Sequence, residues 1–320
     1  MKEFEIIKNY FLSRSHQRKD VQLGIGDDCA VTTVPDGQQL VTTTDTLVEG
    51  VHFPKGTSGR AVAHKSLAVN LSDLAAMGAE PAWISLSLSL PKFDDAWLHE
   101  FSGTLQELSE YYGIQLIGGD TVQGPLSITI TAQGFVPKDQ ALTRSRAKPG
   151  DWIYITGTVG DAALGLKLVK AEERAVLQHH SYLLDRLNFP TPRLLVGTTL
   201  RRIANSCIDI SDGVLSDLQH ILFASQVGAT VDVDNLPLSE AVLETVPQEQ
   251  AYRLGLTGGD DYELLFTISE EQKGNLEVAL ANCNVSATCI GRINGVSEKL
   301  ELRLDEKPYE FNSVGFQHFA

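Results

Sequence analysis

Acidic residues recur in one kind of sequence context along this chain. Residues 26–28 read Gly-Asp-Asp, and related motifs follow at 42–46 (TTTDT), 70–73 (NLSD), 118–121 (GGDT), 208–213 (IDISDG) and 258–263 (GGDDYE). Most of them lie where an apolar segment meets a turn rich in Gly, Ser or Thr. Because α/β folds place ligands in loops at strand ends, this pattern predicts an acidic site assembled from several loops.

Each motif taken alone also fits a structural role. Asp and Ser are favoured at helix N-termini, and IDISDGVLSDL (208–218) has the form of a cap leading into a helix that begins at Val214. Gly-Asp and Asp-Gly pairs are ordinary turn residues. Six repetitions favour a chemical role, because Mg²⁺ is held by a few carboxylates together with water and phosphate oxygens. The motifs lack the Asp spacing and final Glu of an EF-hand loop, so a calcium sensor fits poorly.

The charge of the chain limits its partners. A formal net charge of −15 over 320 residues argues against sequence-independent binding to nucleic acid or to an anionic membrane. At about 5 Å from a bare carboxylate, a phosphate charge is repelled by about 3 kcal/mol at an effective dielectric constant near 20. An acid-rich site for phosphate therefore requires bridging cations, and we expect more than one Mg²⁺ in it.

The usual nucleotide-binding signatures are absent from the sequence. It contains neither GxxxxGK[ST], nor the HRD and DFG set, nor a GxGxxG that opens a helix after a strand. Among the basic residues at 144, 146 and 148, Arg144 is favoured for direct contact with phosphate because its guanidinium donates two parallel hydrogen bonds. A solvated linker is the alternative reading of this segment.

Helical and strand patterns alternate through the chain, which predicts an α/β or α+β fold with two domains. The clearest strands are at 83–90 and 126–132, and helical spacing is strong at 61–77, 193–205 and 214–225. A polar, basic segment with Pro149-Gly150 indicates a boundary. We therefore predict an N-terminal domain at 1–138, a linker at 139–150 and a C-terminal domain at 151–320.

Other sequence features bear on location. No apolar run approaches the roughly 18 residues of a membrane span, and the amphipathic opening MKEFEIIKNYFLSR lacks the apolar core and cleavage site of a signal peptide. The four cysteines are scattered, with no CxxC pair. We expect reduced thiols in a cytoplasmic protein.

Taken in order, the motifs resemble those of the thiamine-monophosphate kinase family, within the aminoimidazole-ribonucleotide-synthetase-like ATP-binding superfamily. The resemblance covers essentially the whole chain. It rests on LGIGDDCA (23–30), TTDTLVEGVHF (43–53), KSLAVNLSDLAAMGAEP (65–81), LIGGDT (116–121), LTRSRAKPGD (142–151), IDISDG (208–213), GGDDYEL (258–264) and GFQHF (315–319). It implies two α/β domains per subunit and a homodimer formed through the sheets of the N-terminal domains, with ATP near that interface.

The same resemblance implies a reaction and a set of roles. The γ-phosphoryl group of ATP would pass directly to thiamine monophosphate, giving thiamine diphosphate without a phosphoenzyme. Asp73, Asp120 and Arg144 would carry this transfer. The implied magnesium ligands are Asp28, Thr43, Thr44, Asp45, Asp73, Asp120, Asp209 and Asp212. The implied ATP contacts are Gly119, Asp120, Arg144 and Ser211, and the implied contacts to thiamine monophosphate are His52, Glu263 and Phe316.

Physical chemistry agrees with such a site. In-line transfer between two phosphates depends on charge neutralisation and alignment. The acceptor is already an anion, so no proton has to be removed before attack.

Three other functions stay open on the sequence. A sibling ATP-dependent synthetase of the same fold would activate an amide or a selenium nucleophile, although no reactive Cys or Lys near the N-terminus supports the selenium case. A non-enzymatic metal-binding module would bind divalent cations without affinity for nucleotide. A metal-dependent phosphohydrolase would release phosphate from thiamine monophosphate without ATP.

The two carboxylates of the first motif can be separated by experiment. The resemblance assigns Asp28 as the metal ligand, whereas Asp27 is a turn residue or a neighbour of the ligand shell. Asp28→Ala should therefore lower Mg²⁺-dependent activity more than Asp27→Ala, measured as the rate of ADP formation over a Mg²⁺ titration. Equal losses in the two variants would contradict this division of roles.

Overall fold

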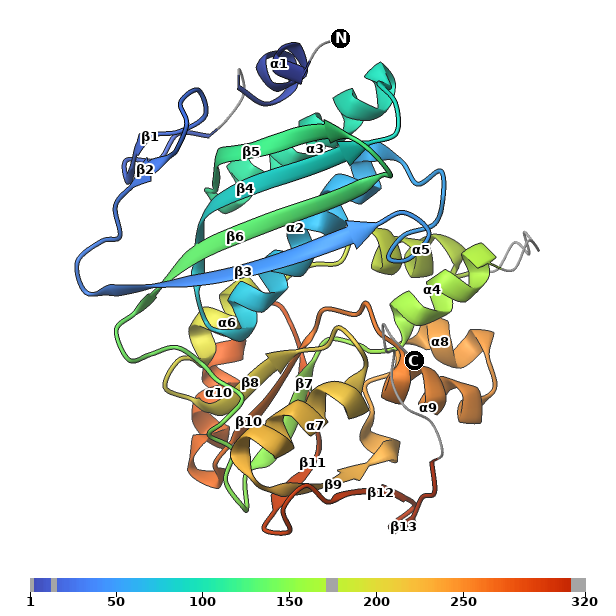
Figure 1. Cartoon of the computed structure of the whole chain (residues 1–320). Coiled ribbons are helices and arrows are strands. Elements are labelled where there is room, and N and C mark those ends of the chain that lie inside the picture. Colours follow the sequence, from blue (N-terminus) through green and yellow to red (C-terminus); the bar gives the residue numbers. More distant parts are fainter. Residues whose placement is uncertain (1–2, 13–15, 171–177, 312–320) are drawn as a thin grey trace. The chain divides into compact units, whose positions relative to one another are not determined.

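The computed structural model describes residues 3–12, 16–170 and 178–311 (Figure 1). The chain divides into two compact units, one made of Met1–Leu74 and Ala79–Asp139, the other of Ala75–Gly78 and Gln140–Ala320. The division after Asp139 falls beside the predicted boundary. The residues predicted as a linker belong to the second unit, because their backbone groups find partners there: the carbonyl of Thr143 accepts from Cys207 N at 3.1 Å.

In the described part of the first unit, four strands form the main sheet in the order β3-β6-β4-β5. These strands are β3 (Gln38–Val48), β4 (Glu80–Leu90), β5 (Gln115–Gln123) and β6 (Ser127–Pro137). Strand β6 runs antiparallel to both neighbours, whereas β4 and β5 are parallel. The helices are α2 (Gly59–Ala76) and α3 (Asp95–Tyr112). Shorter elements precede them: α1 (Glu3–Ile6), η1 (Ile7–Phe11), β1 (Val21–Leu23) and β2 (Val31–Thr32).

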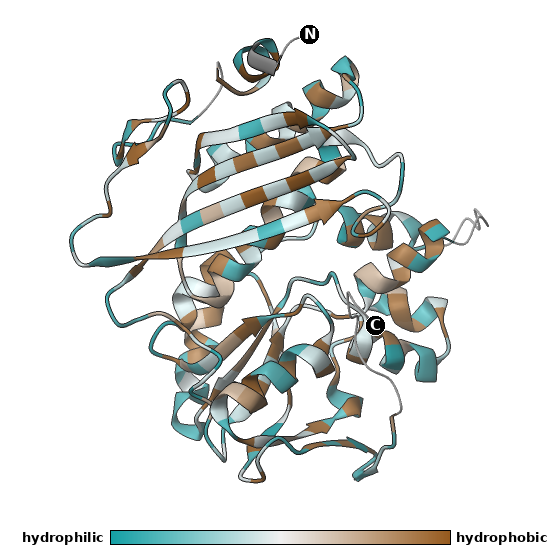
Figure 2. Cartoon of the chain, in the orientation of Figure 1, coloured by the Kyte–Doolittle hydropathy of each residue, from teal (hydrophilic) through white to brown (hydrophobic). Residues whose placement is uncertain are grey.

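The two faces of this sheet differ in chemistry. Successive side chains of a strand point to opposite faces, and Figure 2 shows the resulting alternation along β4 and β6. One face is apolar and buried, with Ile128 and Ile130 of β6 fully buried and Leu74 of α2 packed 3.3 Å from the position a Cβ would take at Gly134. The other face carries Ser and Thr hydroxyl groups. The Thr44 and Thr131 hydroxyls on that face hydrogen bond at 2.9 Å.

The second unit is built on a larger mixed sheet. Its described strands follow the order β13-β12-β9-β11-β7-β10-β8. They are β7 (Trp152–Thr156), β8 (Ala204–Asp209), β9 (Gly228–Asp232), β10 (Leu264–Ile268), β11 (Ala287–Asn294), β12 (Leu300–Leu304) and β13 (Lys307–Pro308). The helices are α4 (Asp161–Lys170), α5 (His180–Asn188), α6 (Leu194–Leu200), α7 (Val214–Ser225), α8 (Glu240–Thr245), α9 (Gln248–Thr257) and α10 (Lys273–Leu280), with 3-10 turns η3 (Val233–Asn235) and η4 (Glu270–Gln272).

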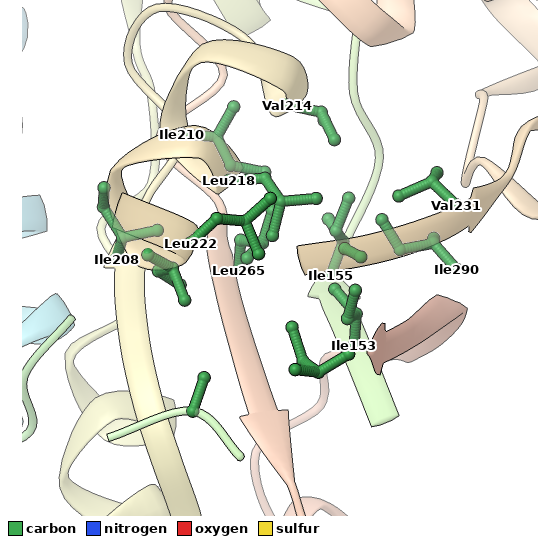
Figure 3. Packing of buried hydrophobic residues seen from close by; sticks show 14 of the residues in the cluster. Ile153, Ile155, Ile208, Ile210, Val214, Leu218, Leu222, Val231, Leu265 and Ile290 are labelled. Atoms are coloured by element: carbon green, nitrogen blue, oxygen red, sulfur yellow. The ribbon is translucent and has the colours of Figure 1, made fainter. Parts of the chain in front are cut away.

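Helix α7 packs on this sheet through a continuous apolar cluster. Leu218 and Leu222 of α7 meet Ile155, Ile208 and Leu265 from three strands (Figure 3). All five side chains are at most 2% exposed. This core holds the end of β8 and the start of β10 in place, where Asp209 pairs with Leu264. The acidic motifs of the second unit lie at the end of β8 and in the loop that follows it, and in the loop before β10.

Two expectations from the sequence are wrong. The helix predicted at 193–205 ends at Leu200, because Arg202 takes a positive φ of 69° and the chain then enters β8. The motifs at 42–46 and 118–121 are predicted at turns, yet they lie inside β3 and β5, whereas the motif at 70–73 lies in α2, within the helix predicted at 61–77. Threonine suits a pleated, half-buried strand, and regular backbone pairing there overrides the turn preference of Gly and Asp.

Among residues 3–12, 16–170 and 178–311, no helix combines the length and apolar character that a membrane crossing requires.

Candidate active site

Strand β3 and helix α2 bring three of the predicted metal ligands together. Thr43 and Asp45 lie on the apolar face of the sheet, since they pair with the buried residues of β6. Helix α2 presents Asp73 to them, and the Thr43 hydroxyl donates a hydrogen bond to Asp73 Oδ2. Burial, followed by the charge of Asp73 and a hydrogen bond with it, raises the pKa of Asp45 to about 6. Two carboxylates and a hydroxyl thus converge, an all-oxygen set that fits Mg²⁺.

Thr44 and Asp120 lie on the opposite face of the same sheet. Asp120 pairs with Ser87 on β4, and both residues are exposed. Strands β6 and β4 separate β3 from β5, so Asp45 and Asp120 are roughly 14 Å apart across three interstrand spacings of about 4.8 Å. The predicted ligands Asp45 and Asp120 of one chain therefore do not reach the same ion.

Glycine is required beside Asp120. Gly119 has a φ of 155°, and a Cβ there would lie 1.9 Å from the carbonyl oxygen of Leu86. The tight approach of β5 to β4 thus depends on the absence of a side chain. Asp120 itself accepts a hydrogen bond from the backbone N–H of Thr121 at 2.9 Å.

Asp28 lies in the turn between β1 and β2, as the sequence suggested for this motif. Its backbone N–H donates to Asp27 Oδ1 at 2.8 Å, and both carboxylates are exposed. The carboxylate of Asp27 thus binds the backbone of the turn, and exposure does not distinguish the two side chains.

His52 follows β3 and has a defined tautomer. The backbone N–H of Val48 donates to His52 Nδ1 at 3.0 Å, and Lys65 Nζ of α2 donates to the His52 carbonyl at 3.2 Å. Because Nδ1 accepts, the proton of the neutral imidazole lies on Nε2. In the neutral form of this half-buried ring, Nε2–H is therefore the donor and Nδ1 the acceptor.

In the second unit, the predicted residues of IDISDG lie at the junction of β8 and α7. Asp209, at the end of β8, is buried, whereas Ser211 and Asp212 are partly exposed. The buried carboxylate of Asp217, one turn into α7, accepts hydrogen bonds from the backbone of this junction. Burial raises the pKa of Asp217 to about 7, against the lowering effect of those backbone donors. Sequence reasoning did not single out Asp217, although an acid placed shortly after Asp-Gly at a helix start is a signal for it.

Glu263 is fully buried and has arginine partners. Arg193 donates from Nε to Glu263 Oε2 at 2.6 Å and from Nη2 to Oε1 at 2.5 Å, and Arg186 Nη2 donates to Oε1 at 3.1 Å. The Thr156 hydroxyl adds a bond of 2.7 Å. A direct contact between Glu263 and a substrate, as predicted from the sequence, would require this pairing to open.

The surroundings of Glu263 explain a glycine-rich loop and add residues that no motif indicated. A Cβ on Gly157 would lie 2.3 Å from Glu263 Oε1, and Gly157 has a φ of 57°. Nearby, Asp261 accepts from the backbone N–H groups of Gly160 at 2.7 Å and Ala162 at 3.3 Å, and burial raises the pKa of Asp261 to about 8. Arg193 sits in no recognisable motif, so only the fold identifies it.

The remaining predicted residues are Arg144 and Phe316. The Arg144 side chain is exposed, and its carbonyl accepts from the Ser225 hydroxyl at 2.7 Å, which ties this segment to the end of α7. Phe316 lies outside the described residues. Over the parts of the chain that the structure describes, no three His, Cys, Asp or Glu side chains form a ready metal cluster.

Comparisons with known proteins cover both units. Residues 26–136 match the family model for the N-terminal domain of AIR synthase related proteins, and residues 148–300 match the model for the C-terminal domain. The chain is 51% identical over 319 residues to the thiamine-monophosphate kinase of Escherichia coli (strain K12), covering 99% of this chain and 98% of that protein.

Solved structures give the same picture. A crystal structure of thiamine-monophosphate kinase from Stenotrophomonas maltophilia K279a has a TM-score of 0.85 at 44% identity, with 92% of this chain and 93% of that chain covered. A structure of AaThiL complexed with AMPPCP and TMP has a TM-score of 0.79 at 30% identity, with 92% of both chains covered.

The Arg193–Glu263 pair makes a prediction about stability. Arg193→Ala removes the bidentate partner of a fully buried carboxylate, so the free energy of unfolding should fall by about 3 kcal/mol or more. The double variant Arg193→Met/Glu263→Gln should lose less, because it leaves no buried charge without its partner. Urea denaturation of the three proteins measures these differences, with the exposed Arg146→Ala as the control. If Arg193→Ala is as mild as the control, the pair does not stabilise the fold.

Proposed function

The chain belongs to the thiamine-monophosphate kinase family, and we propose that it transfers the γ-phosphoryl group of ATP directly to thiamine monophosphate, with Mg²⁺, giving thiamine diphosphate and ADP. The family and the two-domain α/β class predicted from the motifs are confirmed. The chain is accordingly an ATP-dependent phosphotransferase. AaThiL, 30% identical to this chain, has been solved with AMPPCP and TMP, which supports the assignment of both substrates.

One observation carries the magnesium part of the proposal. Asp45 and Asp73 are pressed together on the buried side of β3, where their mutual repulsion helps raise the pKa of Asp45. Asp45, Asp73 and the Thr43 hydroxyl would hold Mg²⁺. When bound, the ion neutralises phosphate oxygens that these carboxylates would otherwise repel.

The proposal also assigns roles to the other predicted residues. We assign Asp28, Thr44, Asp120, Asp209 and Asp212 as further magnesium ligands. Gly119, Arg144 and Ser211 contact ATP in this proposal. Phe316 contacts thiamine monophosphate, and Glu263 does so only if its pairing with Arg193 opens.

His52 and Arg144 act on phosphate by donating hydrogen bonds. His52 offers the Nε2–H group, since Val48 N–H occupies Nδ1. Arg144 offers a planar guanidinium on an exposed segment, which can bind two phosphate oxygens at once. Neither residue needs to remove a proton, because the attacking phosphate is already ionised. The chain's own contribution is therefore alignment and charge complementarity.

We also propose that the active protein is a homodimer that joins through the hydroxyl face of the first unit. Asp120 and Thr44 lie on that face, opposite to Asp45 and Asp73, and Asp120 is about 14 Å from Asp45 because three strand spacings separate β5 from β3. A second copy packed on this face would bring its Asp120 toward the site that contains Asp45 of the first copy. Asp120 of the first copy cannot reach that site. The paired threonine hydroxyls, such as Thr46 with Thr129 at 2.8 Å, satisfy each other and leave a polar but uncharged surface around Asp120.

A direct assay tests the reaction. Incubation with ATP, Mg²⁺ and thiamine monophosphate should yield ADP and thiamine diphosphate in equal amounts, and EDTA should stop the reaction. Phosphate release from thiamine monophosphate without ATP would indicate a phosphohydrolase and not a kinase. The absence of ADP formation with this acceptor would overturn the proposed function.

Mixing two inactive variants tests the shared site. Asp45→Asn and Asp120→Asn should each abolish turnover, with melting temperatures close to that of the wild type. If a site takes Asp45 from one copy and Asp120 from the other, subunit exchange between the variants should restore about a quarter of the wild-type rate, because about half of the dimers are mixed and each has one intact site. The double variant mixed with itself is the control. A mixture that stays inactive after exchange would place both residues' functions within one chain.

A further inference from the structure

The turn between β8 and α7 is folded around the side chain of Asp217. One carboxylate oxygen, Oδ2, accepts hydrogen bonds from the backbone N–H groups of Ser211, Asp212 and Gly213, each at 3.1 Å. Asp217 is only 2% exposed. Three successive N–H groups directed at one point form a concave nest that binds anions. In this turn the chain supplies the anion itself.

A second loop fixes the carbonyl side of the same turn. The carbonyl of Ser211 accepts from Asp260 N at 2.9 Å, and the carbonyl of Ile210 accepts from Tyr262 N at 2.9 Å. Asp260 and Tyr262 have φ values of 70° and 51°, a conformation that is unfavourable for a non-glycine residue and persists only where surrounding contacts impose it. The backbone of the turn is thus held from both sides.

Within this fixed backbone, the partly exposed side chains are those of Ser211 and Asp212, whereas Gly213 and the preceding Asp209 are buried. The N–H groups point inward to Asp217. The Cα–Cβ bonds of Ser211 and Asp212, from which the hydroxyl and the carboxylate extend, are therefore directed by the backbone conformation that Asp217 holds.

We propose that Asp217 is a positioning residue for the cation and nucleotide contacts made by this turn. It acts through Asp212 and Ser211 and touches neither ligand. The inference rests on the proposed function, in which Asp212 binds Mg²⁺ and Ser211 contacts ATP. Residues that orient metal ligands typically change metal affinity by about 10- to 100-fold when removed.

A purely structural role has to be distinguished from positioning. An acid in the first turn of a helix stabilises that helix through its N–H groups and dipole, so Asp217→Ala should lower the melting temperature in either case. Asp151→Ala is a matched control, because Asp151 is also buried and accepts a backbone N–H from Lys148 at 2.9 Å. Its partner Asn205 lies at the other end of β8 from Asp209.

The experiment measures ion affinity and backbone protection separately from catalysis. Mn²⁺ binding is titrated by calorimetry in the presence of ADP, well below the melting temperature of each variant. Asp217→Ala should weaken Mn²⁺ binding by about tenfold or more and should speed amide hydrogen exchange at residues 211–213. Asp217→Asn keeps an acceptor oxygen of the same shape and should recover most of the lost affinity. Asp151→Ala should leave Mn²⁺ affinity unchanged.

A double variant identifies the route of the effect. If Asp217 acts through Asp212, then Asp212→Ala/Asp217→Ala should bind Mn²⁺ no more weakly than Asp212→Ala alone. Additive losses, or an Asn variant as weak as the Ala variant, would mean that the charge of Asp217 acts on the ion directly and would overturn the proposal. Unchanged affinity in Asp217→Ala would also overturn it. The kinase assay on the wild-type protein does not depend on these variants. A negative result there would overturn the proposed function, whereas the Mn²⁺ titrations test the role of Asp217.

Discussion

Asp45 and Asp73 face each other where strand β3 lies against helix α2, and each carries a charge that the other repels. A pair of carboxylates on the buried side of a sheet is unfavourable unless a proton or a cation relieves it, and burial together with Asp73 raises the pKa of Asp45 to about 6. The Thr43 hydroxyl meets part of this need by donating to Asp73. The first unit is arranged around this constraint: β3 supplies the hydroxyl and one acid, and α2 supplies the other.

The same two elements also determine the place of His52. Strand β3 ends at Val48, whose N–H binds the imidazole, and α2 contributes Lys65 to the carbonyl of the same residue. Residues 65 and 73 are eight positions apart on one helix, about 12 Å at 1.5 Å per residue. The contacts that α2 makes with His52 and with Thr43 are therefore separated by a distance that the helix determines.

Acidic residues in the second unit serve a different purpose. Asp217, Asp261 and Glu263 are buried and bind the chain itself, through backbone N–H groups or arginine side chains. These internal contacts shape the loops at the ends of β8 and β10, from which the partly exposed Asp212 extends. A chain with a net charge of −15 thus uses part of its acids to build the backbone that presents the others.

Much of this protein was determined by its sequence. Ordered acidic motifs without a Walker sequence predicted the thiamine-monophosphate kinase family, which the comparisons confirm. The helical pattern at 214–225 located α7 at the residues where it occurs, since local side-chain periodicity reflects which face is buried. What only the tertiary structure decided is which acid faces which environment. TTTDT reads as a loop, yet in a strand it sends Asp45 and Thr44 to opposite faces of a sheet. GGDDYE reads as one acidic cluster, yet Glu263 is fully buried and pairs with Arg193, 70 residues away along the chain. Such partners are distant in sequence, and the burial and charge that they impose arise only when the sheets and helices pack.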